Sequence, residues 1–347
     1  MRIGIDARNF CNSQKNAFAD FIKALSKTDK QNSFNIYCNW FEKINVENFK
    51  IIDSSNYLNF FWEQVLFLSR LKKDNNDVVI SFEETFPVWY KNRYYQIVND
   101  LEQVLYPNLR NSKFLKKYSY LYRKKSNLKN AKKIICYHEK TKVDINEKLN
   151  IEESKIEVIK WFFYKCYETH SLVNIKNKHS ITWDYIIYNS WVWNSKNIKR
   201  LLESLKEVNK KTSLTLVVLW NDATKDIEFR EIVINLWLTQ KVLFLWEIVD
   251  QDITQYYKQA LFVIHPPIYD SFPFCLSEAI NFSSNILSSD LVELKDIFKS
   301  NVNYFNALSK NDLITKMESF KQAKVDYSEI LKNYDCQNFV NKLLKTI

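Results

Sequence analysis

Short apolar runs alternate with amphipathic stretches along most of the chain. The opening segment Met1–Ile5 reads as a buried strand, and Phe18, Phe21 and Leu25 then recur at helical spacing within residues 17–26. The same alternation predicts strands at Phe34–Cys38, Val78–Ser81, Tyr95–Val98 and Lys133–Tyr137, with helices at Trp62–Lys72 and Phe114–Leu128. Strands that alternate with helices predict a mostly parallel sheet covered by helices.

A second series of the same kind follows a polar, aperiodic segment at residues 171–180. Its strands are expected at Tyr185–Tyr188, Leu214–Leu219, Val242–Leu245 and Leu261–His265, and its helices at Ile198–Lys206, Asp226–Leu236, Asp252–Gln259 and Phe274–Phe282. We therefore expect an α/β protein of two doubly wound, Rossmann-like domains, residues 1–172 and 173–332. A last helix, within residues 333–347, is expected to pack back on the first domain.

Composition agrees with two globular domains. The chain has 347 residues, of which 46% are apolar, enough for two packed cores. Its six cysteines show neither a C-x-x-C pair nor a nearby histidine cluster, which argues against a zinc site and a disulfide scaffold. No leader precedes the first strand and no run approaches the roughly 18 to 20 apolar residues of a membrane span, so we expect a cytoplasmic protein.

The net charge of +10 favours anionic partners. Nucleic acid, phosphorylated small molecules and an anionic membrane surface all fit this charge. The basic and aromatic residues of 113–133 fit an amphipathic helix lying on anionic lipid, on the inner membrane face, and fit a merely solvated helix equally well. No nucleic-acid-binding fold is recognisable, so a nucleic-acid partner is not expected.

Two carboxylates stand out in the segment 260–278, ALFVIHPPIYDSFPFCLSE. Asp270 lies in the loop after an expected strand, and Glu278 lies about one turn into the following helix. Ligands of open α/β sheets bind at such strand ends, and a helix start attracts anions. His265 precedes two prolines at the strand end, and we interpret it as a structural residue rather than a general base.

This segment resembles the E-x7-E element of the family 4 glycosyltransferases, with Asp270 and Glu278 as the two acids. The resemblance implies that Asp270 contacts the donor sugar, that Glu278 binds the ribose hydroxyls and that the backbone of Ser271, Phe272 and Phe274 approaches the pyrophosphate. The segment 185–204, YIIYNSWVWNSKNIKRLLES, resembles the element whose lysine neutralises the donor diphosphate, here Lys196. Matched elements in the family's order and spacing extend over about residues 185–306.

The N-terminal half resembles the family more loosely, through IDAR, FWEQ, QIVNDLEQVLYP and KKIICYHEKTK. Asn99 stands where the family has a histidine beside the donor sugar, and Asp100 follows it as in the family. Asparagine donates a hydrogen bond but does not titrate near neutral pH. The resemblance thus implies a catalytic position at Asn99 and Asp100, with a changed side chain at the first.

Glycine is almost absent, because Gly4 is the single one in the chain. Ordinary usage would give roughly 24. Tryptophan stands instead where the family usually has glycine, at Trp161, Trp191 or Trp193, Trp220, Trp237 and Trp246. We hypothesise that UGA codons meaning glycine were translated as tryptophan, which UGG codons at these positions would refute.

The resemblance implies the GT-B arrangement, in which two Rossmann-like domains face a central cleft. It further implies a retaining transfer of a hexose from a nucleoside diphosphate sugar to a saccharide or lipid-linked acceptor, in cell-surface polysaccharide synthesis, without a cofactor or a required metal. The alternative is a catalytically degenerate protein that keeps the fold for binding or scaffolding, because the loop after the first strand, NSQKNAF, lacks the family's glycines.

Overall fold

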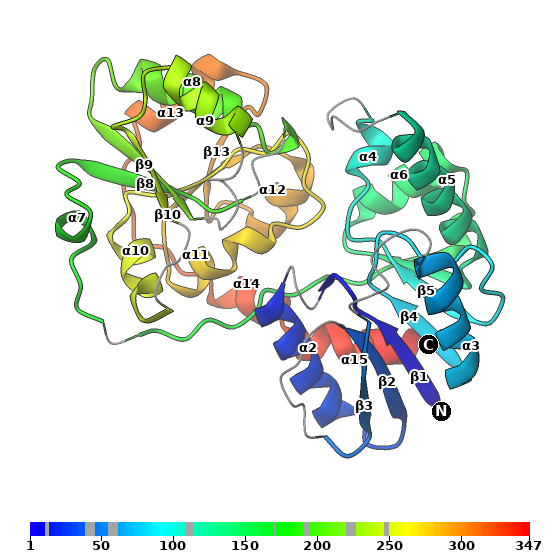
Figure 1. The fold of residues 1–347 in the computed structure, drawn as a ribbon. Helices are drawn as coiled ribbons and strands as arrows, with labels where there is room; N and C mark the ends of the chain where they lie inside the picture. Colours follow the sequence, from blue (N-terminus) through cyan, green and yellow to red (C-terminus); the bar gives the residue numbers. More distant parts are fainter. Residues whose placement is uncertain are drawn as a thin grey trace. The chain divides into compact units, whose positions relative to one another are not determined.

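The computed structural model describes residues 1–10, 14–38, 46–54, 62–107, 114–169, 171–190, 194–219, 227–245 and 250–347. These residues form two compact units (Figure 1): Met1–Tyr164 with Asn333–Ile347, and Lys165–Lys332. The polar segment at residues 171–180 predicts a change of domain at 172/173. Residues 165–172 instead lie in the second unit, where the Thr169 N–H donates to Thr254 Oγ1 at 3.1 Å and the Ser171 hydroxyl donates to Asp252 at 2.6 Å.

The first unit contains a parallel sheet in the order β3-β2-β1-β4-β5-β6-β7. Its strands are β1 (Arg2–Asp6), β2 (Ser33–Cys38), β3 (Phe49–Asp53), β4 (Val78–Ser81), β5 (Tyr94–Ile97), β6 (Lys133–Cys136) and β7 (Ile156–Val158). Its helices are α2 (Lys15–Thr28), the π-helix η2 (Trp62–Phe67) with α3 (Leu68–Asp74), α4 (Glu102–Leu105), α5 (Phe114–Asn130), α6 (Glu139–Leu149), the 3-10 turn η3 (Glu153–Lys155) and α15 (Cys336–Thr346).

The C-terminal helix α15 packs against α2 within this first unit. The rings of Phe21 and Phe339 lie 6.3 Å apart, and both side chains are buried. The amide of Gln337 also donates to the hydroxyl of Thr28. The apolar stripe of α2 is therefore covered by the sheet and by the end of the chain together.

The second unit contains a parallel sheet in the order β10-β9-β8-β11-β12-β13. Its strands are β8 (Asp184–Tyr188), β9 (Leu214–Leu219), β10 (Val242–Leu245), β11 (Val263–His265), β12 (Ile286–Ser289) and β13 (Asn303–Phe305). Its helices are α7 (Ile175–Lys178), the 3-10 turn η4 (Asn194–Lys196), α8 (Ile198–Val208), α9 (Ile227–Asn235), the 3-10 turn η5 (Asp250–Asp252), α10 (Ile253–Gln259), the 3-10 turn η6 (Phe274–Leu276), α11 (Ser277–Asn281), α12 (Val292–Phe298), α13 (Lys310–Glu318) and α14 (Ser328–Asn333).

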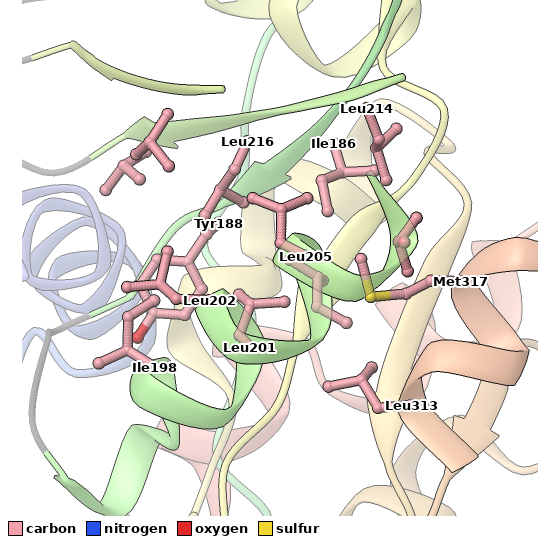
Figure 2. Close-up of a cluster of buried hydrophobic side chains, with 14 of the residues drawn as sticks. Ile186, Tyr188, Ile198, Leu201, Leu202, Leu205, Leu214, Leu216, Leu313 and Met317 are labelled. Carbon is pink, nitrogen blue, oxygen red and sulfur yellow. The ribbon is translucent and has the colours of Figure 1, made fainter. Parts of the chain in front are cut away.

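The core of the second unit forms where α8 covers the sheet (Figure 2). Leu201, Leu202 and Leu205 of α8 are buried against residues of β8 and β9, and Leu313 of α13 closes the cluster. Burial of such a side chain stabilises the fold by about 1.5 to 3 kcal/mol. This packing fixes the start of α8, and with it the turn η4 that carries Lys196.

The expectation of two doubly wound α/β domains is confirmed. The predicted bounds of β4, β9 and β10 agree with the structure, whereas β3, β7, β12 and β13 were not predicted. None of the four is a continuous apolar run: β3, β7 and β13 carry exposed or half-exposed positions, and β12 ends in two serines. These four segments are strands because they pair with neighbouring strands of their sheet, and not because of a pattern in their own sequence.

Trp237 closes α9 in a backbone conformation that glycine favours. Its N–H donates to the Ile234 carbonyl at 2.9 Å, and the N–H of Leu238 donates to the Val233 carbonyl at 3.0 Å, the two bonds of a Schellman motif. Trp237 has φ of 61°, and its side chain is 87% exposed. A left-handed conformation costs a residue with a Cβ about 1 to 2 kcal/mol, and this indole offsets little of that cost by burial.

Trp161 has the opposite environment, although it too is expected to stand at a glycine position. It is buried, and its ring lies 4.5 Å from that of Phe339 and 4.6 Å from that of Tyr137. Trp191, Trp193, Trp220 and Trp246 lie outside the described residues.

The two positions should respond oppositely to glycine. We expect Trp237→Gly to raise the free energy of unfolding by about 1 kcal/mol, because glycine adopts a positive φ without strain. Trp161→Gly should lower it by about 3 to 5 kcal/mol, because a buried ring is lost. Urea unfolding of both variants measures this, and a destabilised Trp237→Gly protein would contradict the strain argument.

Candidate functional site

The candidate site lies in the second unit, at the carboxyl ends of β8 and β11. These strands are neighbours, paired at Ile187 and Val263. After β8 the chain continues to β9 on one side of this pair, and after β11 it continues to β12 on the other side. Loops diverge at such a switch point, which is where open α/β sheets bind ligands. The loop after β8 leads to η4, and the loop after β11 leads to η6 and α11. The Ile268 N–H donates to the Ser195 carbonyl at 2.8 Å, which joins the two loops.

Asp270 is held between two cationic side chains. Its Oδ2 lies 2.8 Å from Nε2 of His265, and its Oδ1 lies 3.2 Å from Nζ of Lys196. Burial by itself would raise the pKa of Asp270, but Lys196 and then His265 lower it below its ordinary value. Although Asp270 is buried, it therefore stays ionised near neutral pH.

His265, the last residue of β11, uses both ring nitrogens. Nε2 faces Asp270, and Nδ1 lies 3.4 Å from Sγ of Cys275 in η6. Burial by itself lowers the pKa of the imidazole, but Cys275 and Asp270 outweigh burial and raise the pKa to about 9. The ring is thus protonated near neutral pH and connects the loop acid to the start of the segment that carries Glu278.

Glu278 lies in the first turn of α11 and faces the end of β8. Its Oε2 lies 3.5 Å from Nδ2 of Asn189, which also donates to the Tyr257 hydroxyl at 2.7 Å. Sequence reasoning missed Asn189 and Tyr257. The position of Asn189, directly after an expected strand, was the available signal, whereas Tyr257 reaches the site from α10 and carries no local signal.

The loop between the two acids is tightly packed. Ser271 and Phe272 are buried, and the rings of Phe272 and Phe274 lie 5.0 Å apart. The N–H of Phe274 donates to the carbonyl of Phe272 at 2.9 Å. The predicted contact of this amide with a pyrophosphate would therefore require that bond to open.

Lys196 ends η4 and is anchored by its neighbours. Asn197 has φ of 58° and donates to the Ala307 carbonyl at 2.9 Å, and Arg200 donates to the same carbonyl at 2.6 Å. The Lys196 side chain is only 14% exposed. The backbone on both sides of the lysine is thus fixed, while its ammonium group points to Asp270.

Asn99 and Asp100 lie after β5 in the first unit. The Asn99 amide donates to the Phe82 carbonyl and accepts from the Tyr137 hydroxyl. Asp100 accepts the N–H of Glu102 at the start of α4, at 2.5 Å. Both side chains hold local structure, and their catalytic assignment stays a prediction.

A buried charged cluster lies at the carboxyl end of β1 in the same unit. Arg8 donates to the two carboxylate oxygens of Asp6 at 2.8 and 3.1 Å and lies 3.5 Å from Glu63. Glu63 also accepts from Arg123 at 3.0 Å. Since removal of one partner of a buried ion pair leaves a buried charge, this cluster ties β1, η2 and α5 together.

Glu83 extends this cluster to the loop after β1 and was not found from the sequence. Its carboxylate accepts the N–H of Asn9 at 2.6 Å and the N–H of Phe10 at 3.4 Å. Burial and then Asp6 raise the pKa of Glu83 to about 8, although Arg8 lowers it. Residues 11–13 of this loop lie outside the described ranges.

Residues 175–335 match the family Glycosyl transferases group 1. The match contains Lys196, Asp270 and Glu278. The chain is also similar to the O-antigen chain mannosyltransferase RfbU of Salmonella typhimurium, with 22% identity over 271 residues, 77% of this chain and 72% of that protein.

Two solved structures share the fold. One is HepE of Anabaena in complex with UDP-glucose, with a TM-score of 0.71, 12% identity and complete coverage of both chains. The other is a glycosyltransferase of Rickettsia africae, with a TM-score of 0.68 and 16% identity over 99% of this chain and 97% of that one. At such identities the likeness shows the fold.

Among the described residues, no group of three or more histidine, cysteine, aspartate or glutamate side chains is arranged to hold a metal ion. No helix in the described ranges is long and apolar enough to cross a membrane.

The contacts of His265 with Cys275 and Asp270 should make stability depend on pH. The imidazole pKa is raised from 6.5 to about 9, so its stabilising effect is complete below pH 6.5 and is lost as pH rises through 9. Relative to His265→Gln, we expect the wild-type free energy of unfolding to fall by about 3 kcal/mol from pH 6.5 to 9.5. Urea unfolding across this range measures the difference, and the comparison cancels the titration of Glu83. Parallel curves for the two proteins would disprove the raised pKa.

Proposed function

We propose that this chain is a glycosyltransferase that moves a hexose from a nucleoside diphosphate sugar to a saccharide or lipid-linked acceptor in cell-surface polysaccharide synthesis. The observation that carries the proposal is the gathering of Lys196, Asp270 and Glu278 at the switch point of the second sheet, inside the region matched by the group 1 family. The likeness to an O-antigen mannosyltransferase supports the hexose and the polysaccharide.

In this proposal the donor binds the second unit by its charged and hydroxyl groups. Glu278 accepts hydrogen bonds from the ribose hydroxyls, for which a carboxylate has several lone pairs. Lys196 neutralises the diphosphate. Its ammonium lies 3.2 Å from Asp270, and as a compact charge on a flexible stem it can turn toward a phosphate oxygen when the donor binds. Asp270 then orients the sugar through lone pairs not used by His265 and Lys196.

The reaction breaks the bond between the anomeric carbon and the diphosphate oxygen and forms a bond to an acceptor hydroxyl oxygen. The departing diphosphate carries the negative charge that develops, and Lys196 is positioned to stabilise it. Fixed charges of this kind typically contribute more to catalysis than other single effects. The acceptor proton passes to the leaving diphosphate, since Asn99 does not titrate. Retention at the anomeric carbon and the absence of a required metal follow from the family resemblance.

The donor site is tested first by binding. Glu278→Ala should weaken binding of a nucleoside diphosphate by about 10 to 100-fold, because hydrogen bonds to a charged group are lost. UDP, GDP, ADP and dTDP, and their hexose conjugates, are titrated by calorimetry. Glu329→Ala removes an exposed acid of α14 and is the matched control.

The outcomes separate the proposal from its alternative. Binding followed by sugar transfer supports the enzyme. Binding of nucleotide sugars without turnover on any acceptor would favour a degenerate binding or scaffolding protein. If no nucleoside diphosphate binds, the donor site is wrong.

The enzyme is further proposed to lie peripherally on the inner, anionic membrane face through α5. Tyr118, Tyr122, Lys125 and Lys129 are exposed and spaced so that they form one stripe of this helix. The expected basic face is narrower than its sequence indicated, because Lys124 is buried against Glu84 and Arg123 is bonded to Glu63. Exposed tyrosines beside lysines suit a lipid headgroup region.

Vesicle binding tests the role of α5. The double variant Lys125→Glu with Lys129→Glu should lose most binding to vesicles with 30% anionic lipid, since each lysine contributes about 1 kcal/mol near such a surface. Lys321→Glu with Lys324→Glu makes the same charge change in exposed residues of the second unit and serves as the control. Equal cosedimentation of both double variants would reject α5 as the contact.

A further inference from the structure

The His265 imidazole connects three segments of the candidate donor site. The ring ends β11, contacts Asp270 in the following loop and contacts Cys275 in η6. It is only 1% exposed. A buried polar ring is tolerated when its nitrogens are paired, and both partners of this ring lie in the segment between β11 and α11.

The contact between His265 and Asp270 matters because the residue at position 270 is an aspartate. The family resemblance leads one to expect a glutamate at position 270, and an aspartate reaches less far by one methylene. His265 meets Oδ2 while Lys196 meets Oδ1, so the carboxylate is fixed on both sides. The orientation of the short side chain is therefore set by His265 as much as by its own backbone.

We infer that His265 is a positioning residue of the donor site, which orients the ionised Asp270 carboxylate and, as an imidazolium, supplies the positive charge that a nucleoside diphosphate requires there. This inference rests on the proposed function and deepens it. His265 acts through Asp270 and through its charge.

Charge counting explains why the imidazolium matters. Lys196 and Asp270 cancel, so their pair attracts an anion weakly, whereas a protonated His265 ring places a second positive charge beside Asp270. Within the described part of the chain, two further titratable groups face this cluster, Cys275 of η6, whose Sγ lies 3.4 Å from the ring, and Tyr188 of β8. Burial, with Cys275 next, holds the pKa of Tyr188 well above its ordinary value, so that phenol stays neutral. The facing position on β12 is Ser288, which does not titrate.

Nucleoside diphosphate affinity as a function of pH tests the inference. The probe is whichever of UDP, GDP, ADP or dTDP binds the wild-type protein most tightly, titrated from pH 7.5 to 9.8. Wild-type affinity should fall about tenfold over this range as the ring loses its proton. His265→Gln, which keeps a donor for Asp270 but carries no charge, should bind about tenfold more weakly at pH 7.5 and show no such step. The two proteins should converge at pH 9.8.

His179→Gln is the matched control, because this histidine lies beside α7 and its ring pairs with the Tyr256 hydroxyl. It should follow the wild-type curve. Where turnover is measured, His265→Leu should lower kcat further than His265→Gln, because leucine also removes the hydrogen bond that orients Asp270. A His265→Gln protein that follows the wild-type curve would overturn the inference while leaving the donor site intact. Absence of nucleoside diphosphate binding to the wild-type protein would overturn both.

A second measurement needs neither nucleotide nor a stable His265 variant. In wild-type protein with ¹³C-labelled histidine, one of the four histidine rings should titrate near pH 9, and Asp270→Asn should lower the pKa of that ring, because Cys275 is then the one contact left to raise it. If no ring titrates above pH 8, or if Asp270→Asn leaves the shift in place, His265 is not the imidazolium partner of Asp270.

Discussion

The buried carboxylate of Asp270 is the point on which the candidate site depends. It accepts from His265 on one oxygen and lies against Lys196 on the other. A buried charge requires such partners, because an uncompensated one costs several kcal/mol. Through these contacts the end of β11, the turn η4 and the loop before α11 hold one another in place. The positions of Lys196 and Glu278 follow from that arrangement.

The parallel sheet makes this arrangement possible. β8 and β11 are far apart in sequence but adjacent in the sheet, so the loops that leave their carboxyl ends meet. The first unit repeats the principle at β1 and β4, where Asp6 and Ser81 lie side by side and the Ser81 hydroxyl donates to Asp6 at 3.2 Å. There, however, Asp6 and Glu63 pair with Arg8 and Arg123, and these four side chains hold structure together.

Much of this could be predicted from the sequence, and the remainder has a common cause. Strands such as Leu214–Leu219 are almost entirely apolar and can be predicted from their local sequence. Asp270, Glu278 and Lys196 were found because their spacing along the chain resembles a family pattern. The task of His265 and the position of Glu83 depend on contacts between loops that only the folded sheet brings together. In the same way, the sequence predicts Lys124 as part of a basic helix face, whereas in the structure its side chain is buried and pairs with Glu84.

The near absence of glycine affects the unfolded chain as well as the folded one. Several helices end on a left-handed residue other than glycine, among them Asn75 after α3, Asn150 after α6 and Lys299 after α12. Each such end strains the native backbone. Glycine, however, is the residue that loses the most conformational freedom on folding, and replacing it typically removes about 0.4 to 1 kcal/mol of that entropic cost. A chain with a single glycine thus has a less flexible denatured ensemble. It loses less conformational entropy on folding, and this smaller loss offsets the strain at its helix ends.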